Sequence, residues 1–169
     1  MIFDTNAFGP FFDKKNTIHG EFRPALEWVL YGKGKLVFGG DKYKKELKAA
    51  PKYIRFFAAL EKAGKIVKVN DEKVNDLEDL VRNIEPSNDF DDPHIIAIVL
   101  VSNCHIVCTG DLRAIPYIKD SRFYTNGTKK PKLYISSRNA SLLSDKYISS
   151  ICKPCQKLAK KSADSLIKM

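Results

Sequence analysis

Short apolar segments alternate with longer, mostly amphipathic segments along this chain. The short segments that we expect to form strands are 1–4, 35–38, 66–69, 105–109 and 133–135. The longer segments that we expect to form helices are 24–31, the stretch after Asp41, the stretch from Pro51 to Gly64, 71–84, 93–101 and 139–151. Strands that alternate with helices at this spacing predict an α/β fold with a central parallel sheet and right-handed crossovers.

The composition is typical of a single globular domain. The 169 residues are 44% hydrophobic and 29% charged, as in ordinary folded proteins, and a chain of this length can bury a full core. No apolar segment approaches the ~20 residues that a membrane helix needs. The N-terminus lacks the basic and then apolar layout of a signal peptide. We therefore expect a cytoplasmic protein with no membrane partner.

The net charge of +9 is concentrated in the C-terminal third of the chain. Residues 1–111 hold 16 Lys and Arg against 17 Asp and Glu, whereas residues 112–169 hold 13 against 3. We divide the chain into a core at 1–120 and a basic extension at 121–169 that contacts a polyanion. Solubility alone is the other interpretation of such an extension. The residues of the extension that we expect to contact nucleic acid are Lys129, Lys130, Lys132 and Arg138.

Four cysteines allow a redox pair or a zinc site. Cys152 and Cys155 have the spacing of a redox pair or of half a zinc site. Cys104 and Cys108 lie around an expected buried strand, which favours a packing role. A zinc site that uses all four cysteines stays an alternative, although only one pair has the usual ligand spacing.

Four acidic residues lie where a parallel sheet would bring them together. Asp4 ends the first strand, Asp111 follows the strand at 105–109, Asp92 precedes a helix, and Glu46 lies on the helix after the second strand. Ligands gather at the carboxyl ends of the strands in open α/β sheets. Carboxylates that converge repel one another unless a cation such as Mg²⁺ or Mn²⁺ binds them. Such a cation would activate water, and we therefore expect phosphodiester hydrolysis.

Three of the four acids also have a simpler interpretation. Asp92 precedes a proline and suits a helix cap. Glu46 suits a surface position with Lys42 as its partner, and Asp111 suits a cap of the following segment. Asp4 has no evident capping role.

Four segments resemble the PIN-domain nucleases, and together they span about residues 1–120. They are Phe-Asp-Thr-Asn at 3–6, Tyr-Lys-Lys-Glu-Leu at 43–47, Asp-Pro-His-Ile-Ile-Ala at 92–97 and Val-Cys-Thr-Gly-Asp at 107–111. The resemblance implies a Rossmann-like three-layer fold with a central parallel sheet. It also implies Mg²⁺ or Mn²⁺ at Asp4, Glu46, Asp92 and Asp111, with Asn6 and Thr109 as supporting polar groups. The implied activity is endonucleolytic hydrolysis of RNA, usually single-stranded, with DNA not excluded.

The same resemblance implies partners, and it leaves some choices open. Many compact members of the family are homodimeric toxins that a small antitoxin protein inhibits, but the segment 121–169 departs from them. Asp89 and Asp91 lie next to Asp92, and either is an alternative for the third acidic ligand. His94 suits a phosphate contact or local packing on its helix. The other functional hypotheses are a non-catalytic PIN-like adaptor that binds nucleic acid or protein, and an α/β protein whose acids are only caps.

Overall fold

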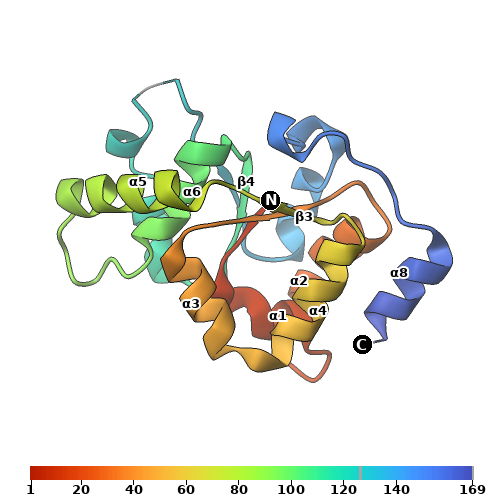
Figure 1. Cartoon of the computed structure of the whole chain (residues 1–169). Coiled ribbons are helices and arrows are strands. Elements are labelled where there is room, and N and C mark those ends of the chain that lie inside the picture. The colour runs from red at the N-terminus through yellow and green to blue at the C-terminus, as the bar shows by residue number, and fades with distance from the viewer. Residues whose placement is uncertain (126, 169) are drawn as a thin grey trace.

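The computed structural model describes residues 1–125 and 127–168, and its centre is a five-stranded parallel sheet (Figure 1). The strands are β1 Ile2–Phe3, β2 Leu36–Phe38, β3 Ile66–Lys68, β4 Ile106–Cys108 and β5 Lys132–Tyr134. Their order across the sheet is β3-β2-β1-β4-β5, and every neighbouring pair is parallel. The predicted α/β fold with a parallel sheet is confirmed.

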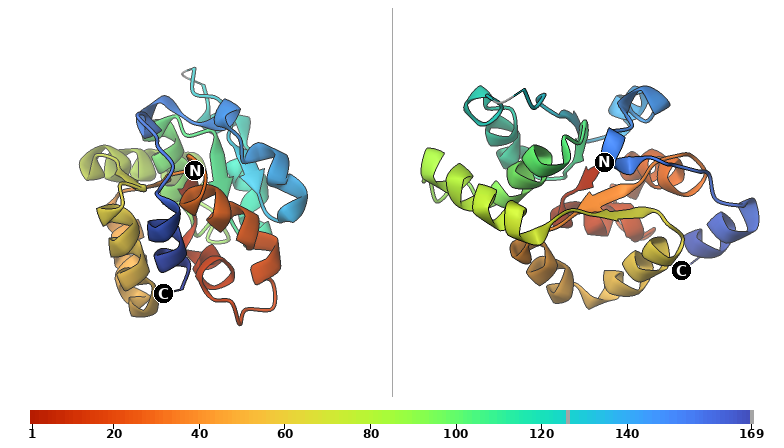
Figure 2. Two further views of the ribbon diagram at one scale, coloured as in Figure 1. Left: turned by 90° about the vertical axis from the view of Figure 1, so that its right-hand side faces the viewer. Right: turned by 45° about the horizontal axis from the view of Figure 1, so that its top comes forward.

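Helices flank this sheet on both faces. The helices are α1 Phe8–Phe12, α2 His19–Leu30, α3 Asp41–Ala49, α4 Pro51–Lys62, α5 Asp71–Ile84, α6 Pro93–Ser102, α7 Ile115–Ile118 and α8 Lys160–Ile167. The step from β1 to β2 and the step from β3 to β4 run in opposite directions across the sheet. Right-handed crossovers therefore place α2 and α6 on opposite faces, as Figures 1 and 2 show. α6 contacts β1 and β2 and packs along α5, while α8 contacts α2 and α4.

Two helix predictions differ from the structure. The segment 139–151 is not one helix, because it forms three short 3-10 turns, η4 Ser137–Leu142, η5 Asp145–Tyr147 and η6 Ser150–Cys152. Two side chains of this segment accept hydrogen bonds from backbone N–H groups that are not part of a helix. Asn139 Oδ1 accepts from Ile135 N, and Ser149 Oγ accepts from His105 N. α2 begins at His19 instead of at Pro24, since its buried face extends back to Phe22.

The turn from β2 into α3 positions the helix that carries Glu46. α3 begins at Asp41, and Gly40 occupies its N-cap position. Gly40 has a φ of 83°, and a Cβ there would lie 2.5 Å from the Val74 side chain of α5. Glycine at this turn allows α3 to pack close to α5.

The strand order reverses between β1 and β4, and this junction is where the acidic residues gather. β1 pairs with β2 on one side and with β4 on the other. The chain leaves these two strands in opposite directions, and ligands of open α/β sheets bind at the carboxyl ends of the strands at such a point. None of the described helices has both the length and the apolar character needed to cross a membrane.

Candidate metal centre

Asp4 extends β1 by one residue and ends in a buried carboxylate. Its backbone N–H donates to Cys108 O at 2.9 Å, and the residue is 1% exposed. Oδ2 accepts 2.6 Å from Asn6 Nδ2 and 2.7 Å from the Thr109 hydroxyl, while Oδ1 accepts 3.2 Å from Asn6 N. Burial raises the pKa of Asp4, and these hydrogen bonds partly oppose the rise. Asp4 therefore caps the 3-10 turn η1, Thr5–Ala7, a role that the sequence did not suggest.

Asn6 and Thr109 link the ends of β1 and β4 around that carboxylate. Asn6 Oδ1 accepts a hydrogen bond of 2.9 Å from Gly110 N, and Thr109 Oγ1 accepts one of 3.0 Å from Asp111 N. Both side chains thus lie beside Asp4, the place that the resemblance gives to the supporting polar groups. The network fixes the geometry between the two strand ends.

Glu46 turns from α3 toward the end of β1. Its Oε2 accepts 2.8 Å from the Thr5 hydroxyl, and Lys42 Nζ lies 3.2 Å from Oε1. Burial alone would raise the pKa of Glu46, but His94, Thr5 and Lys42 outweigh it and lower that pKa to about 2. The Lys42 pair expected for a surface glutamate is present, yet the side chain is only 23% exposed.

Asp92 occupies the N-cap position of α6, as its place before Pro93 predicts, but its side chain makes no capping hydrogen bond. The cap interpretation therefore holds for the position of Asp92 and not for its carboxylate. Burial, together with the charges of Asp4, Glu46 and Asp111, raises the pKa of Asp92 to about 6 against the opposing effect of His94. Four carboxylates from separate segments thus interact electrostatically at this end of the sheet.

Asp111 is held by Arg113. Its Oδ1 accepts 2.8 Å from Arg113 N and its Oδ2 accepts 2.9 Å from Arg113 Nη2. These bonds lower the pKa of Asp111, and Arg113 itself is exposed. The interpretation of Asp111 as a cap is confirmed, because it caps the turn η2, Leu112–Ala114.

His94 is the residue of this site that the sequence suggested only as a phosphate contact or a packing residue, and not as a metal ligand. It is fully buried, and neither ring nitrogen has a hydrogen-bond partner among the described residues. Nε2 lies 3.4 Å from Glu46 Oε2, an ion-pair distance whose alignment is too poor for a hydrogen bond. An unpaired buried polar group costs about 1–3 kcal/mol, so this environment requires an explanation.

Glu46, Asp92 and His94 form a group that suits a metal ion, and we call it the Glu46–Asp92–His94 cluster. One ligand atom from each residue lies within 4.8 Å of the other two. Asp89 and Asp91, the alternatives to Asp92, are exposed and are not part of the cluster.

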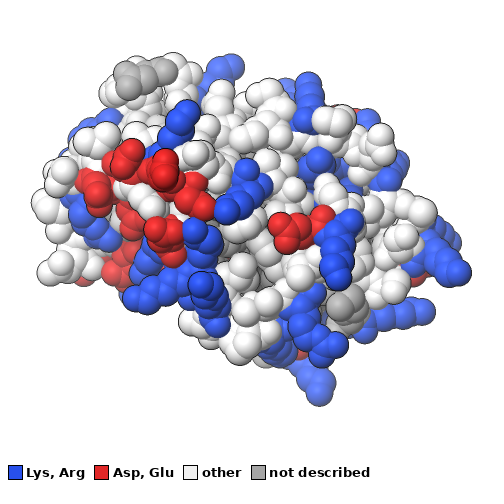
Figure 3. Space-filling view, in the orientation of Figure 1, with Lys and Arg blue, Asp and Glu red and all other residues white. Residues whose placement is uncertain are grey.

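A fifth carboxylate lies near His94, and a separate acidic patch lies over α5 (Figure 3). Glu78 of α5 is partly buried, and its pKa is raised by burial and lowered by the charge of His94. The exposed acids of α5 form the patch seen in Figure 3, where Lys and Arg are spread over the rest of the face. These exposed acids are Glu72, Asp76 and Asp79.

The lysines expected to bind nucleic acid lie at a different place. Three of them line a pocket of about 200 Å³ together with other residues, and the full lining is His105, Lys129, Lys130, Lys132, Lys146 and Tyr147. Lys130 and Lys132 also line a neighbouring cavity of about 480 Å³ that reaches Lys119 and Asn139. We call the two joined cavities the lysine groove. Arg138 is exposed and lines neither cavity.

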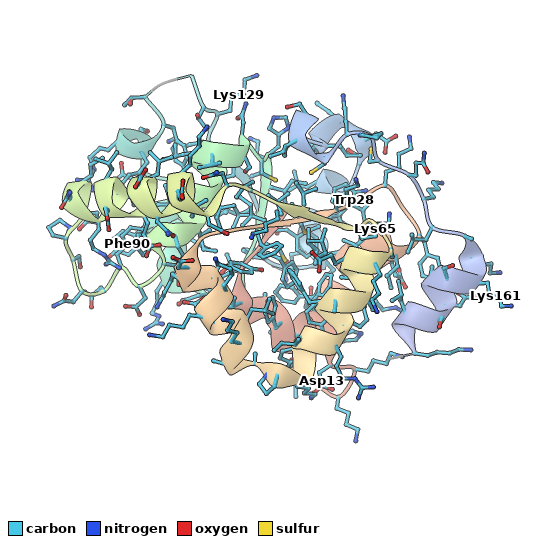
Figure 4. The ribbon with its side chains drawn as sticks, in the orientation of Figure 1. Asp13, Trp28, Lys65, Phe90, Lys129 and Lys161 are labelled. Carbon is cyan, nitrogen blue, oxygen red and sulfur yellow. The ribbon has the colours of Figure 1, made fainter. Side chains whose placement is uncertain are left out.

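The lysine groove begins at the opposite end of the sheet from the acids. Lys132 is the first residue of β5, whereas the acids follow the carboxyl ends of their strands. Figure 4 shows Lys129 well separated from Phe90, which precedes Asp91 and Asp92 in the chain. The groove then extends along the outer edge of β5 to Ile135.

The cysteines do not assemble into a metal site. Cys104, Cys108 and Cys152 are buried, Cys155 is half-buried, and all four are free. Across residues 1–125 and 127–168, the group of three or more potential ligands that comes together contains no cysteine. The zinc alternative is therefore not supported.

Comparisons with protein-family models, with curated proteins and with solved structures gave no match. The function of the chain is therefore inferred from its own residues.

Proposed function

We propose that this protein is a divalent-metal-dependent endonuclease that hydrolyses phosphodiester bonds of RNA, in a PIN-like fold. The observation that carries the proposal is the approach of one ligand atom each from Glu46, Asp92 and His94 to within 4.8 Å. Asp4 and Asp111 add negative charge to this site, because both raise the pKa of Asp92. Mg²⁺ and Mn²⁺ are the ions that suit carboxylates with room for water and phosphate.

The residues of the chain fit this chemistry. A divalent cation would supply the positive charge that activates water and stabilises charge on the phosphate oxygens. Glu46 and Asp92 offer it carboxylate oxygens. Asp4 is fixed by two short hydrogen bonds to Oδ2, which leaves Oδ1, with its longer bond from Asn6 N, to orient a water or bind an ion. Arg113 is exposed beside Asp111 and can turn toward a substrate phosphate.

The lysine groove supports a polymeric substrate over a small one. Its five lysines are Lys119, Lys129, Lys130, Lys132 and Lys146, and no acidic residue lines either cavity. Tyr147 offers a ring on which a base can stack. The lysines of this groove would neutralise phosphates of a bound nucleic-acid chain, while another part of that chain reaches the metal centre. Single-stranded RNA is the first substrate to test, and DNA is the second.

A protein partner belongs to the same proposal. Leu80 and Ile84 of α5 are exposed and line an apolar cavity with Leu77, Leu100 and Phe123. Such a surface suits an antitoxin-like inhibitor or a second copy of this chain, in a protein that acts in the cytoplasm.

Cleavage of labelled single-stranded RNA tests the proposed activity. We expect the wild-type protein to cleave with Mn²⁺ or Mg²⁺ and to be inactive in EDTA. Asp4→Asn and Asp111→Asn should each lower the rate by on the order of 100-fold, because they remove charge from the metal centre. Asp89→Asn is the matched control, since Asp89 is an exposed acid outside the cluster.

Two results would contradict the proposal. Equal cleavage by wild type and by both Asn variants would identify a contaminating nuclease. RNA binding without metal-dependent cleavage would favour the non-catalytic adaptor.

A further inference from the structure

His94 combines complete burial with two unpaired ring nitrogens, and this combination points to a ligand. α6 is buried along most of its length, between α5 and the sheet, which explains why His94 is excluded from solvent. Its neighbour Tyr43 does not donate to it, because the Tyr43 hydroxyl donates to Phe3 O at 2.7 Å. The ring nitrogens are therefore free for a partner that lies between the side chains.

The spacing of the cluster fits a cation between its members. Two ligands on opposite sides of one octahedral divalent ion are separated by about twice a bond of roughly 2.1 Å. The ligand atoms of Glu46, Asp92 and His94 lie within 4.8 Å of one another, so small side-chain movements bring all three into bonding range. The distance of 3.4 Å from His94 Nε2 to Glu46 Oε2 suits two neighbouring ligands of one ion.

The positions of the ligands are set by the fold. Thr5 and Lys42 hold the Glu46 carboxylate, and the centroids of the His94 and Tyr43 rings lie 6.3 Å apart in an edge-to-face arrangement. Asp92 and His94 lie at the start of α6, and α3 brings Glu46 to them. The site is thus largely formed before any ion binds.

We propose that His94 Nε2 is a direct metal ligand, and that the centre therefore selects Mn²⁺ or another transition-metal ion over Mg²⁺. Mg²⁺ prefers oxygen ligands and releases its waters reluctantly, whereas imidazole nitrogen suits transition metals. Mn²⁺ accepts both kinds of ligand. This inference rests on the proposed function only because the ion that His94 binds would also be the ion used in RNA hydrolysis. Metal binding itself can be measured without RNA.

Titration of the metal-free protein with MnCl₂ or MgCl₂ measures the selectivity. We expect Mn²⁺ to bind the wild-type protein at least tenfold more tightly than Mg²⁺. His94→Gln should weaken Mn²⁺ binding by about tenfold or more and leave Mg²⁺ binding within about threefold, since glutamine offers an oxygen in place of the nitrogen. His105→Gln is the matched control, because His105 lines the lysine groove and lies outside the cluster.

Pulsed EPR of the wild-type Mn²⁺ complex tests the bond itself and needs no variant. A ¹⁴N coupling that changes on labelling with ¹⁵N-histidine supports the inference, and the chain has only 3 histidines. His19 is excluded as the source because its Nδ1 contacts Pro10 O at 2.8 Å and it is not in the cluster.

The outcomes separate this inference from the proposed function. Metal-dependent RNA cleavage without nitrogen coupling, or with equal Mn²⁺ and Mg²⁺ affinities, overturns the role of His94 alone. Absence of metal binding in the wild type overturns both. Nitrogen coupling in a protein that does not cleave RNA supports the metal site and contradicts only the nuclease proposal.

Discussion

The hydroxyl of Thr109, at the end of β4, donates a hydrogen bond of 2.7 Å to the buried carboxylate of Asp4, at the end of β1. The two residues are 105 positions apart in the chain. Their contact joins the two strands at which the sheet order reverses. It therefore links the formation of the fold to the geometry of the candidate metal centre.

Removal of this hydroxyl should destabilise the protein. We predict that Thr109→Val lowers the free energy of unfolding by about 1–3 kcal/mol, because the Asp4 carboxylate loses a donor while it stays buried. Urea denaturation measures the change. Thr125→Val is the control, since Thr125 is exposed. An equal decrease in the free energy of unfolding in both variants would show that the hydrogen bond to Asp4 does not stabilise the protein.

The charged carboxylate of Asp92 should destabilise the folded protein when no metal is bound. Its pKa in the folded protein, about 6, lies above the value of 3.8 for a free carboxyl. The protonated form therefore favours folding below about pH 4, and this contribution is lost as the pH rises through 6. After allowance for partial exposure, Asp92→Asn should raise the free energy of unfolding by about 1–2 kcal/mol at pH 7.5 in EDTA.

The same substitution should give no gain at pH 4, where Asp92 is already protonated. Denaturation curves at both pH values check this difference. Asp89→Asn should leave both curves nearly unchanged. A stability loss for Asp92→Asn at pH 7.5 would mean that the acids do not repel one another there.

Metal binding should weaken in acid. A cation must displace the proton of Asp92, so the affinity for Mn²⁺ should fall by up to about tenfold per pH unit below pH 6. Calorimetric titration between pH 5 and 8 measures this dependence. An affinity that is constant over this range would exclude Asp92 as a ligand.

Arg113 should act on the substrate and not on the metal. Arg113→Ala frees Asp111 from its 2.9 Å ion pair, so Mn²⁺ affinity should stay equal or increase. The KM for RNA should rise by about tenfold, because the variant has no guanidinium to bind the phosphate. Arg55→Ala, at an exposed position on α4, should change neither, and a loss of Mn²⁺ affinity in Arg113→Ala would contradict this role.

The lysine groove should determine RNA affinity and its salt dependence. Replacement of Lys129, Lys130 and Lys132 by alanine should weaken RNA binding and reduce the salt slope by about 0.7 for each phosphate that a lysine no longer neutralises. Fluorescence anisotropy at several salt concentrations measures both. A control variant replaces Lys157, Lys160 and Lys161 by alanine and so removes the same charge outside the groove. An equal loss of RNA affinity in this variant would show that the net charge, and not the groove, determines binding.

The sheet and part of the site could be predicted because they follow from local patterns. Asp4 and Asp111 each follow a short apolar segment, and parallel strands place such residues at one edge of the sheet. The role of Asp92 needed the structure, since its sequence position also suits a cap that its side chain does not form.

His94 and the C-terminal turns could not be predicted from local patterns. His94 occupies a helix position that suits any core residue, and only the packing of α3 beside the start of α6 shows that it faces Glu46. The segment 139–151 has helix-compatible residues, but Asn139 and Ser149 bond to backbone elsewhere. Both outcomes depend on contacts between distant parts of the chain.

The most direct test of the central claim compares Mn²⁺ occupancy with RNA cleavage in the same samples. The cleavage rate of single-stranded RNA should rise in step with Mn²⁺ binding. Asp92→Asn should shift both curves together to higher Mn²⁺ concentration. Cleavage that persists in EDTA, or a binding curve that shifts while the cleavage curve does not, would contradict a metal-dependent nuclease centred on Asp92.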